Sequence, residues 1–156
     1  MSEEYTNEPM LDMFLFETTQ LIEQLEQSIL ASEKTSCFTP DTINEIFRIM
    51  HTIKGSSAMM MFDGISTIAH SIEDIFYCLR EEKPNHVDCS ALSGLVLEGA
   101  DFIKGEVDKI KNGNNADGNA AKLLDSIKGF LSDLKGSGNA FKAVVYFEEG
   151  CEMANI

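Results

Sequence analysis

The sequence predicts an all-α fold: an up-and-down four-helix bundle with an additional carboxy-terminal helix, followed by a short strand-like tail. Apolar residues recur every three or four positions in five successive segments, which is the spacing of amphipathic helices. Connections rich in glycine, proline and polar residues separate these segments. The chain has 156 residues, of which 44% are apolar, so it is long enough to form the core of one domain.

The first two helices have clear apolar stripes. The first is expected from near Pro9 to about Ser32, with Asn7 as a candidate cap. The second begins at residues 39–42, where a capping threonine, a proline at the first helical position and an acidic residue follow one another. The inward-facing residues are Leu11, Phe14, Leu21, Ile22, Leu25 and Ile29 in the first helix, and Ile43, Ile46, Phe47, Met50 and Ile53 in the second.

The third helix follows a corner near Phe62, and Asp63 is placed to cap it. The charged run before Pro84 ends this helix, and Asp88 is the expected cap of the fourth. The inward-facing residues are Ile65, Ile68, Ile72, Ile75, Phe76 and Leu79 in the third helix, and Leu92, Leu95, Val96, Phe102, Ile103, Val107 and Ile110 in the fourth.

A polar, glycine-rich loop at 111–119 precedes the fifth helix, which is expected at 120–134. Its inward-facing residues are Leu123, Leu124, Ile127, Phe130, Leu131 and Leu134. The Gly-Ser-Gly-Asn stretch at 136–139 is expected to break the helical pattern. The β-branched and aromatic run at 142–147 then has the profile of a strand.

Charge and cysteine usage exclude several classes of function. Lys and Arg total 12 against 26 Asp and Glu, and the formal net charge of −14 would repel nucleic acid and anionic lipid. The four cysteines show neither a C-x-x-C pair nor metal-finger spacing, so reduced thiols in a cytoplasmic protein are expected, without zinc. No apolar run has the length of a signal peptide or a membrane span, which predicts no insertion into a membrane.

Four polar residues are predicted to meet on the second and third helices. If these helices fold back antiparallel about residue 62, His51 lies level with Glu73, and Lys54 lies level with His70. Within each helix the two polar residues are about one turn apart and share a face. A packed bundle gains nothing from such a convergence, so a chemical role is indicated.

Phosphoryl carriage by histidine fits these four side chains. A neutral imidazole has one basic nitrogen that can act as a nucleophile, and Glu73 would accept the hydrogen bond from the other, protonated nitrogen of His51. Lys54 would offset charge on the phosphoryl oxygens, and His70 would donate a further hydrogen bond. Gly55 lies one turn after the histidine and would leave access for a second protein.

The sequence HTIKG at 51–55, followed by AHSIE at 69–73, resembles the signature of histidine phosphotransfer (HPt) domains. More narrowly, it is similar to the amino-terminal HPt domain of chemotaxis histidine kinases of the CheA type. The similarity covers residues from about 8 to 135 and includes the 19-residue gap between the two histidines. One departure concerns the corner, where many relatives have Gly-Phe and this chain has Met61-Phe62.

The resemblance implies roles for the matching residues. His51 corresponds to the phosphorylated histidine and Glu73 to the glutamate that hydrogen-bonds it. Lys54 and His70 correspond to the family's conserved lysine and second histidine. The partners implied are a kinase ATP-binding domain, which phosphorylates His51, and the receiver domain of a response regulator, whose aspartate then takes the phosphoryl group.

The resemblance also implies what this chain lacks. No cofactor is expected within it, because ATP and Mg²⁺ would be supplied by the partner domains. The tail resembles the start of the regulator-binding domain that follows in CheA proteins. The expected organisation is therefore an HPt domain at 1–138 and, at 139–156, a linker with the truncated start of a following domain.

Two other classes of function stay open on the sequence. A metal-binding helical bundle could use two histidines and a glutamate, but di-iron bundles need two Glu-x-x-His motifs and this chain contains none. A non-catalytic helical adaptor is the other alternative. An adaptor would tolerate His51→Gln, whereas a phosphoryl carrier would not.

Overall fold

The computed structural model describes residues 2–34, 37–84 and 86–142, and every regular element among them is a helix. The helices are α1 (Ser2–Lys34), α2 (Pro40–Met59), α3 (Asp63–Glu82), α4 (Cys89–Lys111) and α5 (Ala121–Lys142). This confirms the predicted all-α class. Apart from Lys142, which ends α5, the predicted strand-like tail lies outside the described residues, so that part of the prediction, and the domain boundary with it, stays a prediction.

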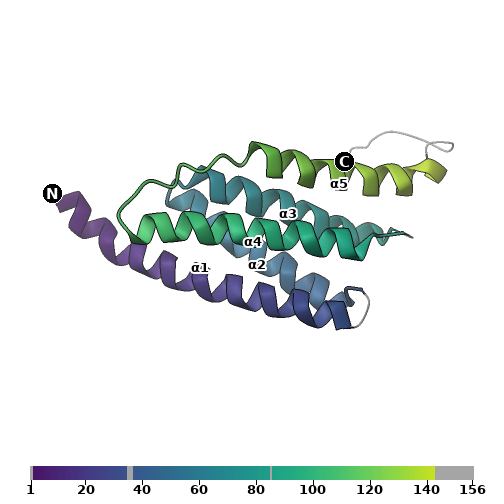
Figure 1. Cartoon of the computed structure of the whole chain (residues 1–156), viewed down its shortest axis with the longest axis horizontal. Coiled ribbons are helices and arrows are strands. Elements are labelled where there is room, and N and C mark those ends of the chain that lie inside the picture. Colours follow the sequence, from purple (N-terminus) through teal and green to yellow (C-terminus); the bar gives the residue numbers. More distant parts are fainter. Residues whose placement is uncertain (1, 35–36, 85, 143–156) are drawn as a thin grey trace.

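The four helices α1 to α4 form the bundle (Figure 1). α2 and α3 make the most extensive pair, α1 packs against α2 and α4, and α3 completes the ring against α4. α5 lies outside this ring, along α3 and α4. None of the described helices is both long and apolar enough to cross a membrane.

The core consists of the aliphatic stripes that the helical spacing predicts. Its fully buried side chains on the two central helices include Ile46, Met50 and Ile53 on α2, and Ile65, Ile68, Ile72, Ile75 and Phe76 on α3. Each fully buried side chain of this size contributes roughly 1.5–3 kcal/mol. The α2–α3 pair is therefore held rigidly from behind, and its outward face is free to carry polar groups.

The predicted caps of α2 and α4 are confirmed. The Thr39 hydroxyl accepts a hydrogen bond from the Thr42 N–H at 3.2 Å, and the Asp88 carboxylate accepts one from the Ala91 N–H at 3.1 Å. Each such cap stabilises its helix by about 1 kcal/mol. The prediction for α3 was wrong, because Asp63 is the first helical residue and the cap position before it is Phe62, with no side-chain hydrogen bond. Asp63 can still interact favourably with the helix dipole.

The corner between α2 and α3 is as tight as one with glycine. Met61 adopts the left-handed conformation, with φ of +66°. The Phe62 N–H donates to the Ser57 carbonyl at 2.8 Å, and the Met61 N–H donates to the Ala58 carbonyl at 3.0 Å. This is the hydrogen-bond pattern of a Schellman motif, in which glycine is the usual left-handed residue. Methionine in place of the usual glycine therefore preserves the turn, but its left-handed conformation is strained.

Two helices are longer than predicted. α1 begins at Ser2 rather than near Pro9, which lies inside the helix. α5 continues through residues 136–139 to Lys142. Glycine weakens a helix by about 1 kcal/mol relative to alanine but does not block its hydrogen bonds as proline does, so this stretch did not end the helix.

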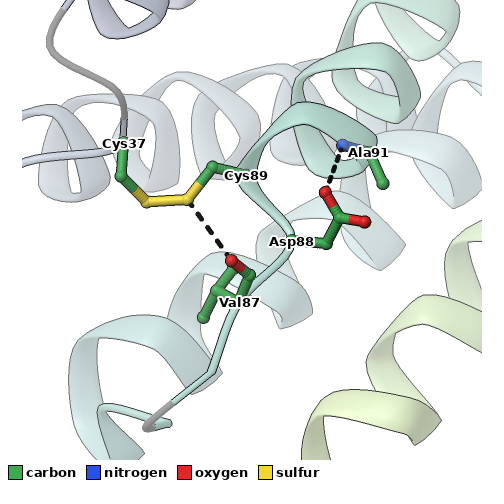
Figure 2. Close-up of a disulfide and its surroundings, with 5 residues drawn as sticks. All are labelled: Cys37, Val87, Asp88, Cys89 and Ala91. Carbon is green, nitrogen blue, oxygen red and sulfur yellow. Dashed lines mark hydrogen bonds between the residues drawn. A yellow bond between two sulfur atoms is a disulfide. The ribbon is translucent and has the colours of Figure 1, made fainter.

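The expectation of reduced thiols is also corrected. Cys37, in the α1–α2 connection, forms a disulfide with Cys89, the first residue of α4, at a Cα–Cα distance of 5.5 Å (Figure 2). The two residues are 52 positions apart, and only the folded bundle brings their segments to the same end. Cys78 is buried and its thiol donates to Glu82 Oε1 at 3.7 Å. Cys151 lies outside the described residues.

Candidate functional site

His51 and Glu73 form a direct contact between α2 and α3. His51 Nδ1 lies 2.6 Å from Glu73 Oε2, which confirms that these two residues lie level after the corner. The imidazole is 61% exposed, whereas the carboxylate is only 7% exposed. The helix pair thus presents a histidine to solvent while fixing it from below with a buried anion.

Lys54 completes the support of this carboxylate. Its Nζ lies 2.8 Å from Glu73 Oε1, so the two carboxylate oxygens have different cationic or hydrogen-bonding partners. Burial alone would raise the pKa of Glu73, but the hydrogen bonds and charges of Lys54 and His51 outweigh it and hold that pKa below its usual range. Glu73 is therefore ionised near neutral pH and can only accept hydrogen bonds.

An ionised Glu73 determines which tautomer of His51 is present. The ring must donate its Nδ1–H to the carboxylate, which leaves the lone pair on Nε2. No polar contact to Nε2 occurs within the described part of the chain. The arrangement can therefore present Nε2 as a nucleophile, and the carboxylate can stabilise the positive charge that the ring gains as Nε2 forms a bond.

His70 lies apart from these three groups. Its Nε2 is 3.6 Å from Asp74 Oδ1, one turn further along α3, and its side chain is exposed. Among the described residues it makes no polar contact with His51, Lys54 or Glu73. Burial raises the pKa of Asp74; the charge of His70 opposes this shift and that of Glu73 adds to it. His70 and Lys54 were predicted to lie level on the two helices, but their side chains do not face each other. The direction of a side chain also depends on its angular position around the helix axis.

Gly55 lies on the open surface, one turn after His51. A Cβ atom built at this position would meet no other group within 4 Å. The chain itself therefore leaves the space beside the histidine empty. The structure agrees with the predicted access for a second protein, although it does not test that role.

The sequence model of the Hpt domain matches residues 9–113, which is more than half of the chain and includes the whole of α2 and α3. This chain belongs to the Hpt domain family. A solved relative supports the assignment: the solution structure of the histidine phosphotransfer domain of CheA is 32% identical, with a TM-score of 0.69, over 83% of this chain and 93% of that one.

Other relatives of this Hpt domain are much longer proteins. Chemotaxis protein CheA of Treponema pallidum (strain Nichols) is 33% identical over 125 residues, which are 80% of this chain and 15% of that protein. CheA of Borreliella burgdorferi is 39% identical over 98 residues, or 63% of this chain and 11% of that protein.

A second solved structure shares the fold. The phosphorylated P1 domain of CheA3, solved in complex with CheY6 from R. sphaeroides, has a TM-score of 0.70 over 81% of this chain and 98% of that one, at 17% identity.

Three residues of this Hpt domain were not predicted as part of the site: Phe47, which lies beside His51, and two residues that contact Phe47. The Phe47 ring is nearly parallel to the imidazole, at 13° and 6.1 Å between centroids. The Arg80 guanidinium lies 4.3 Å above the Phe47 ring and 5.6 Å from that of Tyr77. Phe47 precedes His51 by four positions and Tyr77 follows Glu73 by four, so the same helical spacing that predicts the core could have placed them here.

Metal binding receives no support within the Hpt domain's described residues. No group of three or more His, Cys, Asp or Glu side chains there is arranged to hold a metal ion. His51 and Glu73 instead satisfy one another, and Lys54 occupies the position where a cation would meet the second carboxylate oxygen.

Proposed function

We propose that this chain is a phosphoryl carrier, in which His51 accepts a phosphoryl group from a kinase ATP-binding domain and donates it to an aspartate of a response-regulator receiver domain. The observation that carries the proposal is the exposed imidazole whose Nδ1 is held 2.6 Å from a buried, ionised carboxylate. Such a ring offers one nucleophilic nitrogen in a fixed orientation to a visiting protein.

Each residue of the site then has a defined part in the transfer. Nε2 of His51 attacks the terminal phosphorus of ATP, and the bond between that phosphorus and the bridging oxygen breaks, so that ADP leaves with this oxygen. The ring gains positive charge as the N–P bond forms, and the Glu73 carboxylate stabilises it through the Nδ1–H. Lys54 keeps Glu73 ionised. Because Lys54 lies about one helical turn from His51, it also adds positive charge near the transferred phosphoryl group. In the second transfer an aspartate oxygen of the receiver replaces Nε2 on phosphorus.

The partner domains supply the remaining components. This chain spans 15% or less of the first two curated relatives it matches, both named chemotaxis protein CheA, and ATP and Mg²⁺ would bind to domains outside it. The solved complex of a phosphorylated P1 domain with CheY6 supports a receiver as the second partner. We place the exchange in the cytoplasm, where ATP is available.

Radiolabelled phosphotransfer tests the proposal. The chain is incubated with a cognate kinase domain, Mg²⁺ and radiolabelled ATP, and label that is acid-labile and base-stable is expected on His51. His51→Gln should abolish the label, whereas His86→Gln, at an exposed histidine in the connection before α4, should keep it. Addition of a receiver domain should then remove the label from the wild-type chain.

The same experiment separates the carrier from a helical adaptor. An adaptor would bind its partner equally well with glutamine at position 51 and would acquire no phosphoryl group. Acid-stable label on Ser56 or Ser57, or label that persists in the His51→Gln variant, would contradict the proposal.

A further inference from the structure

The Cys37–Cys89 disulfide lies at the end of the bundle where the α1–α2 and α3–α4 connections meet (Figure 2). Cys37 is exposed and Cys89 is half-buried. The sulfurs are separate from the phosphotransfer site, which lies on the outer face of α2 and α3. Nothing in the transfer chemistry uses them, so they call for an explanation of their own.

Small molecules can reach this disulfide from solvent. Cys37 lines an open groove of about 530 Å³ between the ends of α2 and α3, together with Phe38, Ile43, Leu79 and Val87. Both cysteines also line a smaller hollow of about 200 Å³ beside α4, which includes Glu33 and Ser93. Exposed disulfides are the ones that exchange readily with thiols, whereas buried ones resist reduction.

We propose that Cys37 and Cys89 form a reversible thiol–disulfide exchange site that reacts with low-molecular-weight disulfides such as oxidised glutathione. In the dithiol state the Cys37 thiolate attacks one sulfur of oxidised glutathione and releases one glutathione thiolate. The Cys89 thiolate then attacks Cys37 Sγ and releases the second. The two cysteines lose two electrons and two protons in total, and one oxidised glutathione becomes two reduced molecules.

The surroundings of the two sulfurs assign these separate roles. Cys37 is the more exposed, so an external reagent meets it first. Cys89 is the first residue of α4, where the helix dipole stabilises a thiolate, and this makes it the better leaving group during reduction. The Asp88 carboxylate is turned toward the Ala91 N–H, away from the sulfurs (Figure 2). The Val87 carbonyl oxygen lies 3.6 Å from Cys89 Sγ and can accept a hydrogen bond from the reduced thiol.

The bond encloses the helices that carry the phosphotransfer site. The 52-position separation of the cysteines spans the whole of α2 and α3, so oxidation ties the start of this pair to the start of α4. Phe38, next to Cys37, packs edge-on against the buried Phe76 at 5.5 Å and would be held in place by the bond. Closing a loop of this length should raise the melting temperature by on the order of 10 °C.

Thiol counting by mass spectrometry tests the exchange on the 156-residue chain. After oxidised glutathione, denaturation and alkylation, Cys37 and Cys89 should both be protected from the alkylating reagent and carry no added glutathione mass; after excess reduced glutathione, both should be alkylated. Cys89→Ser should trap a glutathione adduct on Cys37, whereas Cys37→Ser should give far less adduct on Cys89. Cys78→Ser is the control and should keep the protected pair.

Thermal melting provides the second readout. The difference in melting temperature between oxidised and reduced protein should be present in the wild type and absent in both Cys37→Ser and Cys89→Ser. Alkylation of both Cys37 and Cys89 after oxidised glutathione would overturn the proposal. A bond that resists a hundredfold excess of reduced glutathione would also overturn it, because the pair would then be a permanent cross-link.

Discussion

Lys54 Nζ lies 2.8 Å from Glu73 Oε1, on the carboxylate oxygen that His51 does not contact. A buried carboxylate thereby remains charged, since a cation and a ring N–H together compensate for its lost hydration. The charge on Glu73 in turn determines the tautomer of His51. In the proposed transfer, Glu73 and Lys54 together therefore prepare the nucleophilic nitrogen of His51.

Removal of this carboxylate should impair phosphorylation much more than folding. For Glu73→Ala we expect the rate of phosphorylation of His51 by a cognate kinase domain to fall by about 100-fold, the low end of what a positioned acid–base group contributes. The physical reason is that Nδ1–H loses its acceptor and the tautomer with the proton on Nε2 becomes populated. Single-turnover transfer from kinase and ATP measures this rate.

Glu106 offers the matched control for that variant. It is also a buried carboxylate on a helix, 3% exposed, and is paired with Lys109 at 2.9 Å, but it lies on α4, away from His51. Glu106→Ala should lower the free energy of unfolding and leave the phosphorylation rate of the folded protein unchanged. Equal loss of rate in both variants would show that Glu73 acts only through stability.

The lowered pKa of Glu73 predicts a dependence of stability on pH. Because the native state binds this proton more weakly than the unfolded state, the unfolded chain carries more protons as the pH falls, and stability decreases there. The contribution is fully present above the ordinary glutamate pKa, near ~4.3, and is lost as the pH falls through the lower pKa of the native state. Urea unfolding from pH 3 to 7 should show that the free energy of unfolding falls more steeply with acidification in the wild type than in Glu73→Gln. Parallel dependence on pH in the two proteins would contradict this.

Much of the fold followed from local signals in the sequence. The caps Thr39 and Asp88 have side chains that bond the first turn of their own helix, so a few consecutive residues suffice to predict them. The conformation of Met61 was not predictable in this way, since few residues other than glycine adopt a positive φ and only the closed turn imposes it here. The Cys37–Cys89 bond depends on how the α1–α2 connection meets the start of α4, which spacing along the chain does not encode.

The site was predicted to the extent that it depends on helix register. His51 and Glu73 meet because both lie eleven residues from the corner, a relation that the sequence contains once the hairpin is assumed. The ion pair of Lys54 with Glu73, and the turn of His70 toward Asp74, depend on side-chain direction around each helix. Arg80 illustrates the same limit, because its long side chain reaches back over Phe47 from a position near the end of α3.

Glycine at position 61 should stabilise the protein. Met61→Gly removes the clash between Cβ and the backbone in the left-handed region, and the methionine side chain is 82% exposed, so few contacts are lost. We expect a gain of about 1 kcal/mol in the free energy of unfolding, after the larger entropy of the unfolded glycine chain is taken into account. Met59→Gly, at an equally exposed residue with helical backbone, should destabilise by a similar amount. Loss of stability in both variants would contradict the inference that the backbone is strained at position 61.

Gly118 should be intolerant of even one added methyl group. Its N–H donates to Glu106 Oε1 at 2.9 Å, which ties the α4–α5 connection to a buried carboxylate. A Cβ at this position would overlap Glu106 Oε2 and lie 3.0 Å from Cε1 of Phe102. Glu106 cannot move away without weakening its ion pair with Lys109.

We therefore expect Gly118→Ala to lower the free energy of unfolding by roughly 2 kcal/mol, as overpacking of a well-packed site does. Gly105→Ala is the matched control, since this exposed α4 position has no group within 4 Å of the new Cβ and alanine favours the helix by up to ~1 kcal/mol. Urea unfolding of both variants should give shifts of opposite sign. Stabilisation by both substitutions would mean that the Gly118 amide is not held against Glu106 in solution.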